Sequence, residues 1–247
     1  MYRFDPIGRI RSCFPQKFGI PRQSGLVPQA TAVLELFAPY GRAEALAGLE
    51  AFSHLWVVFI FHAHLDRPWH PTVRPPRLGG NRRIGLFASR SAFRPNPIGI
   101  SAVRLAGIRQ EGDRAEIDIG GGDFLHGTPV LDIKPYLPYA DAIAEAAGGY
   151  APEAPPRLPV DFAPEAEAAC RQSGDKGLKA LIAGVLANDP RPAYDAQNRG
   201  KAVYGMRIRD LEIKWRVRGQ RAQVLSVAPA AHKPDPPGAF SPLDPES

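Results

Sequence analysis

Short apolar runs separated by glycine and proline characterise the chain up to residue 147, and few stretches there have a helical period. The run HLWVVFIF (54–61) is apolar on both faces, which predicts a fully buried strand. Further strands are predicted at 31–37, 83–89 and 128–138, and two more within 99–120 around a turn at 110–113. One short helix is expected within 38–52. This pattern is typical of a mainly β domain, either a barrel or a sandwich.

Residues 148–160 are rich in proline and glycine and predict a linker between two domains. The next pattern is helical and ends before Pro190, with an apolar stripe of Leu178, Leu181, Ile182, Val185 and Leu186. From 202 to 217 the pattern alternates as in strands, with a basic face formed by Lys214, Arg216 and Arg218. We therefore expect a small α+β domain over 161–229 and a disordered tail over 230–247.

The composition, with 44% hydrophobic and 23% charged residues, is that of a folded globular protein. Only two cysteines occur, Cys13 and Cys170, which argues against a disulfide scaffold or a four-cysteine zinc site and fits a reducing cytosol. The N-terminus has no apolar run of signal-peptide length, and the longest apolar run, LWVVFIF, is far shorter than a membrane span. We expect a cytoplasmic protein.

The distribution of charge says more than the net value of +6. No Asp or Glu lies between residues 67 and 110, a stretch that contains Arg67, Arg74, Arg77, Arg82, Arg83, Arg90, Arg94, Arg104 and Arg109. Arginine in such excess over lysine suits the planar recognition of phosphate or carboxylate. The sequence therefore predicts an anionic partner.

The motif HAHLD (62–66) follows the predicted buried strand and resembles the zinc loop of metallo-β-lactamase-like hydrolases. His62, His64 and Asp66 would be the metal ligands in that interpretation. The usual loop has another histidine after the aspartate, whereas this chain has the cation Arg67. We favour the alternative, in which a strand leaves the core at a polar mouth, and expect no metal.

Two other stretches suggest ligand binding. IDIGGGDF (117–124) begins like the nucleotide loop of Rossmann methyltransferases, but no helical period follows, so a bend of bare backbone is the better interpretation. PTVRPPRLGG and SRSAFRPNPIG combine arginines with prolines that fix the backbone, and Phe87 and Phe93 lie among the charges. Arginines held beside aromatic rings suit a planar, anionic ligand such as a nucleotide.

Together, PRQSGLV, GLEAFSHLWVVFIFH, RPPRLGGNRRIGLFASRSAFRPNPIG, DFLHGTPVLDIKPYLP and DPRPAY resemble the TsaA-like family in its bacterial TrmO type, in order from Ile7 to Val227. The resemblance implies a single-sheeted β-barrel over residues 1–147 that binds S-adenosylmethionine. It implies methylation of N6 of threonylcarbamoyladenosine, beside the anticodon of threonine tRNA at position 37. It also implies a homodimer with the cofactor near the subunit interface, and a C-terminal domain that helps to hold tRNA.

The resemblance assigns the cofactor contacts position by position: Pro21, Arg22, Gln23, His62, Ala63, Arg90, Ile100, Asp123, Phe124, Leu125 and His126. Some members of the family have a polar amide where this chain has Ala63 and an aspartate where it has His126. At these two positions the resemblance supports backbone contacts more than side-chain contacts.

Methyl transfer to a urea-like nitrogen is easier once its proton is lost, so a positioned base is expected. The sequence leaves the base open among His126, Asp123, Asp189 and Tyr194. The threonyl carboxylate could be bound by Arg77, Arg83, Arg94 or Arg191, and the face of Lys214, Arg216 and Arg218 would meet tRNA phosphates. Two alternatives stay open beside the tRNA methyltransferase: a metallohydrolase at the HAHLD motif and a non-catalytic RNA-binding module.

Overall fold

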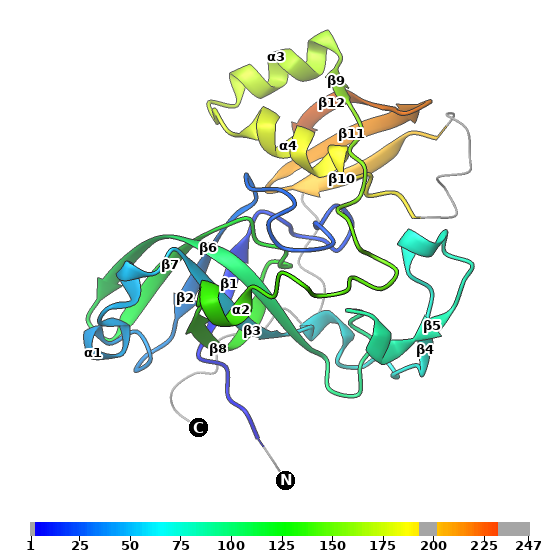
Figure 1. Ribbon diagram of the computed structural model, residues 1–247. Helices are drawn as coiled ribbons and strands as arrows, with labels where there is room; N and C mark the ends of the chain where they lie inside the picture. Colours follow the sequence, from blue (N-terminus) through cyan, green and yellow to red (C-terminus); the bar gives the residue numbers. More distant parts are fainter. Residues whose placement is uncertain (1–2, 193–201, 232–247) are drawn as a thin grey trace.

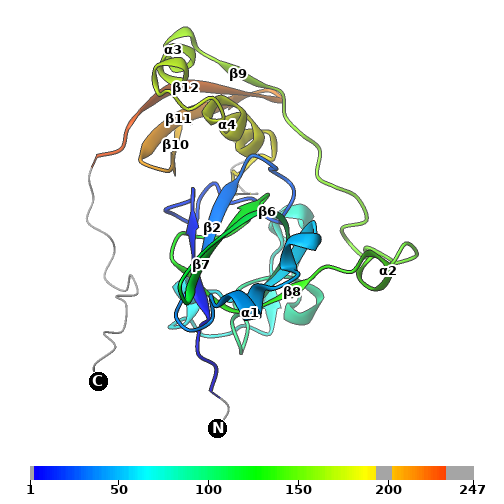
Figure 2. The same ribbon diagram turned by 90° about the vertical axis from the view of Figure 1, so that its left-hand side faces the viewer.

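The computed structural model describes residues 3–192 and 202–231, and its first part is a closed barrel of six antiparallel strands (Figure 1). Around the barrel the order is β1-β2-β7-β6-β3-β8, and β1 pairs with β8 to close it. The strands are β1 (Gly8–Ser12), β2 (Thr31–Leu36), β3 (His54–Ile60), β6 (Ile98–Glu111), β7 (Arg114–Gly120) and β8 (Thr128–Pro135). Figure 2 looks into the barrel. The predicted β-barrel of a single sheet is confirmed.

Alternation along each strand fills the barrel with side chains. Leu34, Leu55, Ile117 and Val130 are fully buried, and each such side chain contributes about 1.5–3 kcal/mol. The prediction that β3 is buried on both faces is wrong. Its odd-numbered positions face the interior, whereas Trp56 and its outward neighbours are half-buried, because no second sheet covers the outside of a closed barrel.

Two segments outside the barrel strands are short helices or turns. α1 (Ala43–Leu46) is the helix predicted within 38–52, and a 3-10 turn at Leu49–Ala51 follows it. Between β3 and β6 the chain makes a long excursion with 3-10 turns at His62–His64, Pro76–Leu78 and Leu86–Ala88 and a two-residue ladder of β4 (Thr72–Val73) and β5 (Ile84–Gly85). The strand predicted at 83–89 is therefore wrong beyond β5, because Leu86 turns inward and is 1% exposed.

The second part is a four-stranded sheet in the order β10-β11-β12-β9, with helices on one face (Figure 1). Its elements are β9 (Val160–Phe162), α3 (Pro164–Gln172), α4 (Leu178–Ala187), β10 (Tyr204–Ile208), β11 (Leu211–Arg218) and β12 (Arg221–Pro229), while α2 (Pro138–Asp141) precedes the linker. The expected small α+β domain is confirmed, and α4 buries the predicted apolar stripe. Residues 232–247 of the predicted tail lie outside the described residues.

The connection between β1 and β2, residues 13–30, belongs to the second core although it lies within the first domain in sequence. Cys13, Phe14, Val27 and Ala30 are buried in one apolar cluster with α4 and the second sheet. The backbone N–H of Arg209 also donates to the carbonyl of Cys13 at 2.8 Å. In Figure 1 this blue segment lies between the barrel and the second sheet. The two parts are thus joined by a shared core as well as by the linker.

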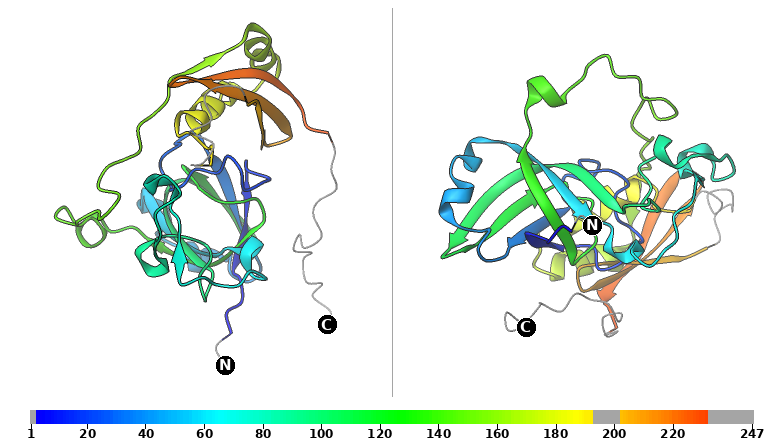
Figure 3. Two further views of the ribbon diagram at one scale, coloured as in Figure 1. Left: turned by 90° about the vertical axis from the view of Figure 1, so that its right-hand side faces the viewer. Right: turned by 90° about the horizontal axis from the view of Figure 1, so that it is seen from below.

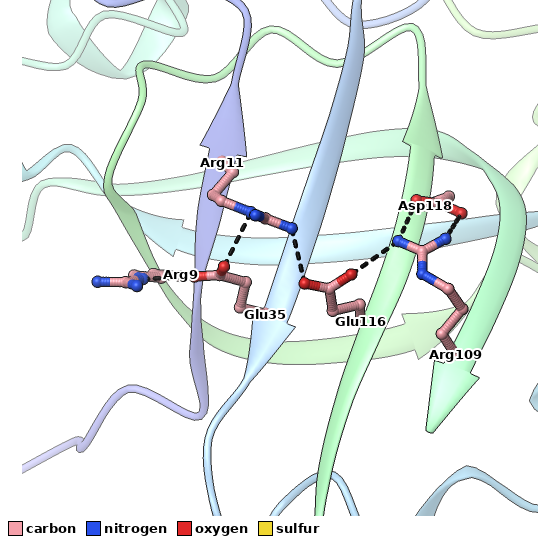
Figure 4. A network of polar contacts seen from close by, with 6 residues as sticks. All are labelled: Arg9, Arg11, Glu35, Arg109, Glu116 and Asp118. Atoms are coloured by element: carbon pink, nitrogen blue, oxygen red, sulfur yellow. Dashed lines mark hydrogen bonds and ion pairs between the residues drawn. The ribbon is translucent and has the colours of Figure 1, made fainter. Parts of the chain in front are cut away.

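A chain of ion pairs crosses the outside of the barrel over β1, β2, β7 and β6 (Figure 4). Its members are Arg9, Glu35, Arg11, Glu116, Arg109 and Asp118. The N···O distances of the contacts to the two glutamates run from 2.5 to 2.8 Å. Exposed pairs of this kind contribute about 0–1 kcal/mol each. Their main consequence is that these arginines are neutralised locally and do not form a free basic surface.

Candidate functional site

A cavity of about 440 Å³ lies at one end of the barrel, where three loops meet the strand ends. The long excursion after β3 lies at this opening, as the left view of Figure 3 shows. Five segments line the cavity: residues within 17–23, 59–64, 89–94, 98–101 and 123–128. The walls therefore come from both the barrel and the segment 13–30 that is anchored in the second core.

Glycines allow two of these walls to approach closely. Gly99 of β6 lies directly against the ring of Phe59, so a Cβ there would overlap the ring. Gly121 has a φ of +72° and accepts a hydrogen bond from the N–H of Gly25 at 2.8 Å. The glycine run before Asp123 therefore forms a bend, as predicted, and this bend holds the segment 13–30 beside the cavity.

Asp123 is the carboxylate that lines the cavity. Its Oδ1 atom is buried and has no hydrogen-bond partner among the described residues. Burial raises the pKa of Asp123 above its ordinary value, against smaller opposing effects of Ser101 and Arg90. An ionised carboxylate here is poorly solvated at Oδ1, and a cationic ligand group or a proton would stabilise it.

Another part of the cavity wall carries basic side chains. His62 and His64 stand at the two ends of the 3-10 turn that follows β3, and both line the cavity together with Lys17. Burial lowers the pKa of both histidines below its ordinary value, and the charge of Lys17 acts in the same direction. Both imidazoles are therefore predominantly neutral at pH 7.

Three arginines of the cavity wall are held by polar partners. Arg22 donates to the carbonyl oxygens of Asp189 at 3.3 Å and Arg191 at 3.1 Å, which ties the wall to the DPRP segment after α4. Arg90 donates to Oε1 of Gln23 at 2.5 Å. Arg94 donates to the carbonyl of Ser89 at 2.8 Å, and its Cζ lies 5.6 Å from the ring centre of an exposed phenylalanine. These contacts fix the arginine side chains before any ligand binds.

The structure brings the predicted cofactor contacts together at this cavity, except for two. Phe124 is 1% exposed and packs in the barrel core, with its ring centre 5.1 Å from that of Phe59. His126 lies outside the wall, and its Nδ1 is 3.3 Å from the carbonyl oxygen of Ser12. The others line the cavity: Pro21, Arg22, Gln23, His62, Ala63, Arg90, Ile100, Asp123 and Leu125.

The predicted substrate and tRNA residues are spread over four places. Arg94 lines the cavity, whereas Arg77 and Arg83 are exposed on the excursion after β3. Arg191 makes a bidentate ion pair with Asp189, with both N···O distances 2.8 Å. The basic residues of β11 lie on the outer face of the second sheet, away from the cavity: Lys214, Arg216 and Arg218. Tyr194 lies outside the described residues.

The HAHLD motif does not assemble the predicted metal ligands. His62 and His64 line the cavity, but Asp66 is exposed and lies off its wall. Within residues 3–192 and 202–231, no three His, Cys, Asp or Glu side chains are grouped so that they could hold a metal ion. Over the same described ranges, no helix is long and apolar enough to cross a membrane.

Several lining residues were missed by the sequence interpretation, above all Lys17, Phe61, Ser89, Ser101 and Thr128. Lys17 stands alone in an unremarkable stretch, and no motif contains it. Ser101 follows Ile100 along β6 and faces inward, so the alternation of that strand could have found it.

Comparisons with known proteins give a consistent result. The profile of the tRNA-methyltransferase O N-terminal domain matches residues 9–142, and that of the TrmO C-terminal domain matches residues 155–230. A tRNA (adenine(37)-N6)-methyltransferase of Escherichia coli is 45% identical over 231 residues, which are 92% of this chain and 98% of the relative. A candidate S-adenosylmethionine-dependent methyltransferase of Pseudomonas aeruginosa, RcsF, is 47% identical over 90% of this chain and 96% of its own. The crystal structure of TrmO from P. aeruginosa has a TM-score of 0.77 at 41% identity, covering 93% of this chain and 98% of that chain.

Proposed function

The chain belongs to the TrmO family of tRNA (adenine(37)-N6)-methyltransferases, and we propose from this premise that it methylates tRNA with S-adenosylmethionine as methyl donor. More narrowly, the substrate we propose is threonylcarbamoyladenosine at position 37 of threonine tRNA, which receives the methyl group on N6. Because tRNA is the substrate, we place the reaction in the cytoplasm.

The observation that carries this proposal is the cavity with Asp123 in its wall. S-adenosylmethionine carries positive charge on its sulfonium and its ammonium group, and the poorly solvated carboxylate of Asp123 suits such a group. The rings of Phe59 and Phe61 and the side chain of Ile100 offer apolar contact to the remainder. When bound, the cofactor supplies an electrophilic methyl carbon.

We assign the cofactor-binding role to those predicted contacts that line the cavity: Pro21, Arg22, Gln23, His62, Ala63, Arg90, Ile100, Asp123 and Leu125. The glycine bend at 120–122 and the contacts of Arg22 and Arg90 fix this wall in advance. A wall fixed in advance aligns the reacting groups without further ordering, and alignment is a large part of the rate of an in-line displacement.

The proton of N6 needs an acceptor other than Asp123, because a carboxylate paired with a cation is a weak base. Asp189 is already paired with Arg191, and the distance between Nε of the arginine and Oδ1 of the aspartate is 2.8 Å. His126 is exposed and lies outside the wall, yet it is close enough to His62 for its charge to act on that imidazole. We assign His126 as the proton acceptor, since imidazole is the side chain that most often accepts protons near neutral pH.

For tRNA we propose the arginine arm, which we define as residues 67–97. The arm contains Arg67, Arg74, Arg77, Arg82, Arg83, Arg90 and Arg94. They form no ion pair with a described residue, in contrast to Arg9, Arg11 and Arg109 in the chain of ion pairs on the barrel, which we call the barrel ladder. Trp69 and Phe87 are 52% and 76% exposed on the same arm. Unpaired arginines with exposed rings suit a single-stranded loop, where phosphates and unstacked bases are both accessible. The outer face of β11 offers a second basic surface.

We further propose a homodimer through the outer face of β3 and β6. Ile98 and Ile100 are 41% and 56% exposed there and pair across the strands with Ile60 and Val58. Both exposed isoleucines also line the cavity, so a second copy on this face would cover its edge. Ile100→Glu should give a monomer in analytical ultracentrifugation, and a dimer that persists would overturn this part.

The experiment for the function mixes the purified protein with radiolabelled S-adenosylmethionine and two threonine tRNAs. One tRNA carries every modification except this methyl group, and the other is unmodified. Label only in the modified tRNA, at position 37, is the expected result. Salt-sensitive tRNA binding without cofactor binding would identify an RNA-binding module instead. Activity lost on chelation and restored by zinc would favour the metallohydrolase.

A further inference from the structure

Lys17 lies in the cavity wall, and the proposed reaction has so far given it no role. Its Nζ donates to the carbonyl oxygen of Ala63 at 2.9 Å, across the cavity mouth from one wall segment to another. No carboxylate among the described residues lies within ion-pair distance of this ammonium group. An ammonium group has three protons, so two remain for a ligand.

The neighbours of Lys17 are basic as well. Ala63 stands between His62 and His64, and Arg67 follows one turn later. Burial lowers the pKa of Lys17, and the charge of Arg67 lowers it further. The pKa of His64 is lowered by burial and then by Lys17, Arg67 and His62. Lys17 and Arg67 carry like charges without a described counter-anion and repel each other, and an anion between them would remove that repulsion.

We propose that Lys17 and the His62–His64 turn form a subsite for a carboxylate group. This inference rests on the proposed function, in which both reactants bring one carboxylate: the methionyl end of S-adenosylmethionine and the threonyl end of threonylcarbamoyladenosine. The subsite and Asp123 belong to different wall segments, so the cavity offers both a cationic and an anionic group. A zwitterionic or carboxylate-bearing ligand is thereby oriented.

The cavity arginines are less available for this task than Lys17. Arg22 already donates to two backbone carbonyls, and Arg90 to Gln23. Arg94 donates to Ser89 and lies over an aromatic ring. A ligand carboxylate would have to compete with these contacts. It can bind the ammonium group of Lys17, in contrast, without displacing the hydrogen bond from Lys17 to the carbonyl of Ala63.

The test uses Lys17→Met, which keeps most of the aliphatic side chain and removes the charge, with Lys17→Arg as the charge-retaining variant. Lys176→Met is the matched control, because Lys176 is exposed and lies away from the cavity. Calorimetry gives the Kd for S-adenosylmethionine and for decarboxylated S-adenosylmethionine. Filter binding gives the Kd for threonine tRNA with and without the threonylcarbamoyl group.

A contact with the cofactor carboxylate predicts that Lys17→Met weakens S-adenosylmethionine binding about 10-fold and leaves the decarboxylated analogue unchanged. A contact with the threonyl carboxylate predicts that the Kd for S-adenosylmethionine is unchanged and that affinity falls by a similar factor for the modified tRNA only. Lys17→Arg retains most of the affinity in either case.

Three results would overturn the subsite. One is a Lys17→Met protein whose Kd values for all four ligands lie within twofold of the wild-type values. Another is an equal loss for both cofactors, which indicates a structural role. The third is an equal loss for both tRNAs, which indicates a phosphate contact. A wild-type protein that binds no S-adenosylmethionine would instead overturn the proposed function, and the subsite with it.

Discussion

Replacing Asp123 with asparagine tests whether its buried carboxylate serves a cation in the cavity. The side chain keeps its shape, but the negative charge is lost. In the free protein that charge is poorly solvated, because Oδ1 is buried without a partner and burial raises the pKa above the ordinary 3.8. The ionised carboxylate therefore destabilises the free fold, and the substitution should stabilise it.

The magnitude follows from the lost charge. Leaving a buried polar group without a hydrogen bond costs about 1–3 kcal/mol and more for a charged group, and asparagine retains the unpaired oxygen without the charge. We therefore expect Asp123→Asn to stabilise the free protein by about 1 kcal/mol at pH 8, which raises the Tm by about 2–4 °C for a chain of this size. Because the folded-state pKa is raised, this difference should vanish below pH 3.8 and grow as pH rises through the folded value.

Ligand binding should change in the opposite direction. A charge-assisted hydrogen bond contributes about 1.5–3 kcal/mol, so the Kd for S-adenosylmethionine should rise at least 10-fold. Differential scanning fluorimetry over pH 4–8 and calorimetry measure the two effects on one preparation. A variant that is no more stable than wild type at pH 8 and binds the cofactor equally well would refute the reasoning. Unchanged binding with loss of the acidic limb of the kcat profile would instead identify Asp123 as the proton acceptor.

Three further predictions concern other parts of the site. Gly99→Ala should destabilise the fold by about 1–3 kcal/mol and weaken cofactor binding, because the new methyl group displaces the ring of Phe59; denaturant titration and calorimetry measure both. Burial lowers the pKa of His62, so the unfolded chain takes up the proton first and the free energy of unfolding should fall as pH drops below 6.5. His62→Gln should reduce this loss of stability, as measured by denaturant titration between pH 8 and 5. Arg83→Ala should reduce the slope of log Kd against log salt for tRNA by about 0.7, whereas Arg11→Ala, a paired member of the barrel ladder, should leave it unchanged.

The barrel strands and α4 were predictable because hydrophobic periodicity reports burial directly. β1 was missed because GRIRS contains a single large apolar residue, Ile10, and its arginines pair with partners on other strands. β9 has three residues and gains its place from parallel pairing with β12, far along the chain. Such strands are stabilised by pairing with strands that are distant in the sequence, and the local hydrophobic pattern carries little information about that pairing.

The candidate site was likewise predictable only in part from the sequence. The motif-rich stretches led to the cavity, and HAHLD pointed to its wall, although its three candidate metal ligands are not grouped there. His62 and His64 lie on a 3-10 turn that faces the cavity, whereas Asp66 has already left it. Lys17 could not be found from sequence, because its significance depends on the carbonyl of Ala63 and on basic groups that only the fold brings near.

The segment 13–30 explains why the two parts of the chain act together. It lines the cavity with Lys17 and Arg22, and its ends are held in the second core by Phe14 and Val27. Arg22 also holds the carbonyl of Asp189 at the end of α4. A ligand that binds this wall therefore contacts the segment that also holds the DPRP residues, because residues 13–30 belong to both the cavity wall and the second core. The linker at 148–160 separates two patterns in the sequence, but the physical connection between the cavity and the second sheet runs through the β1–β2 connection.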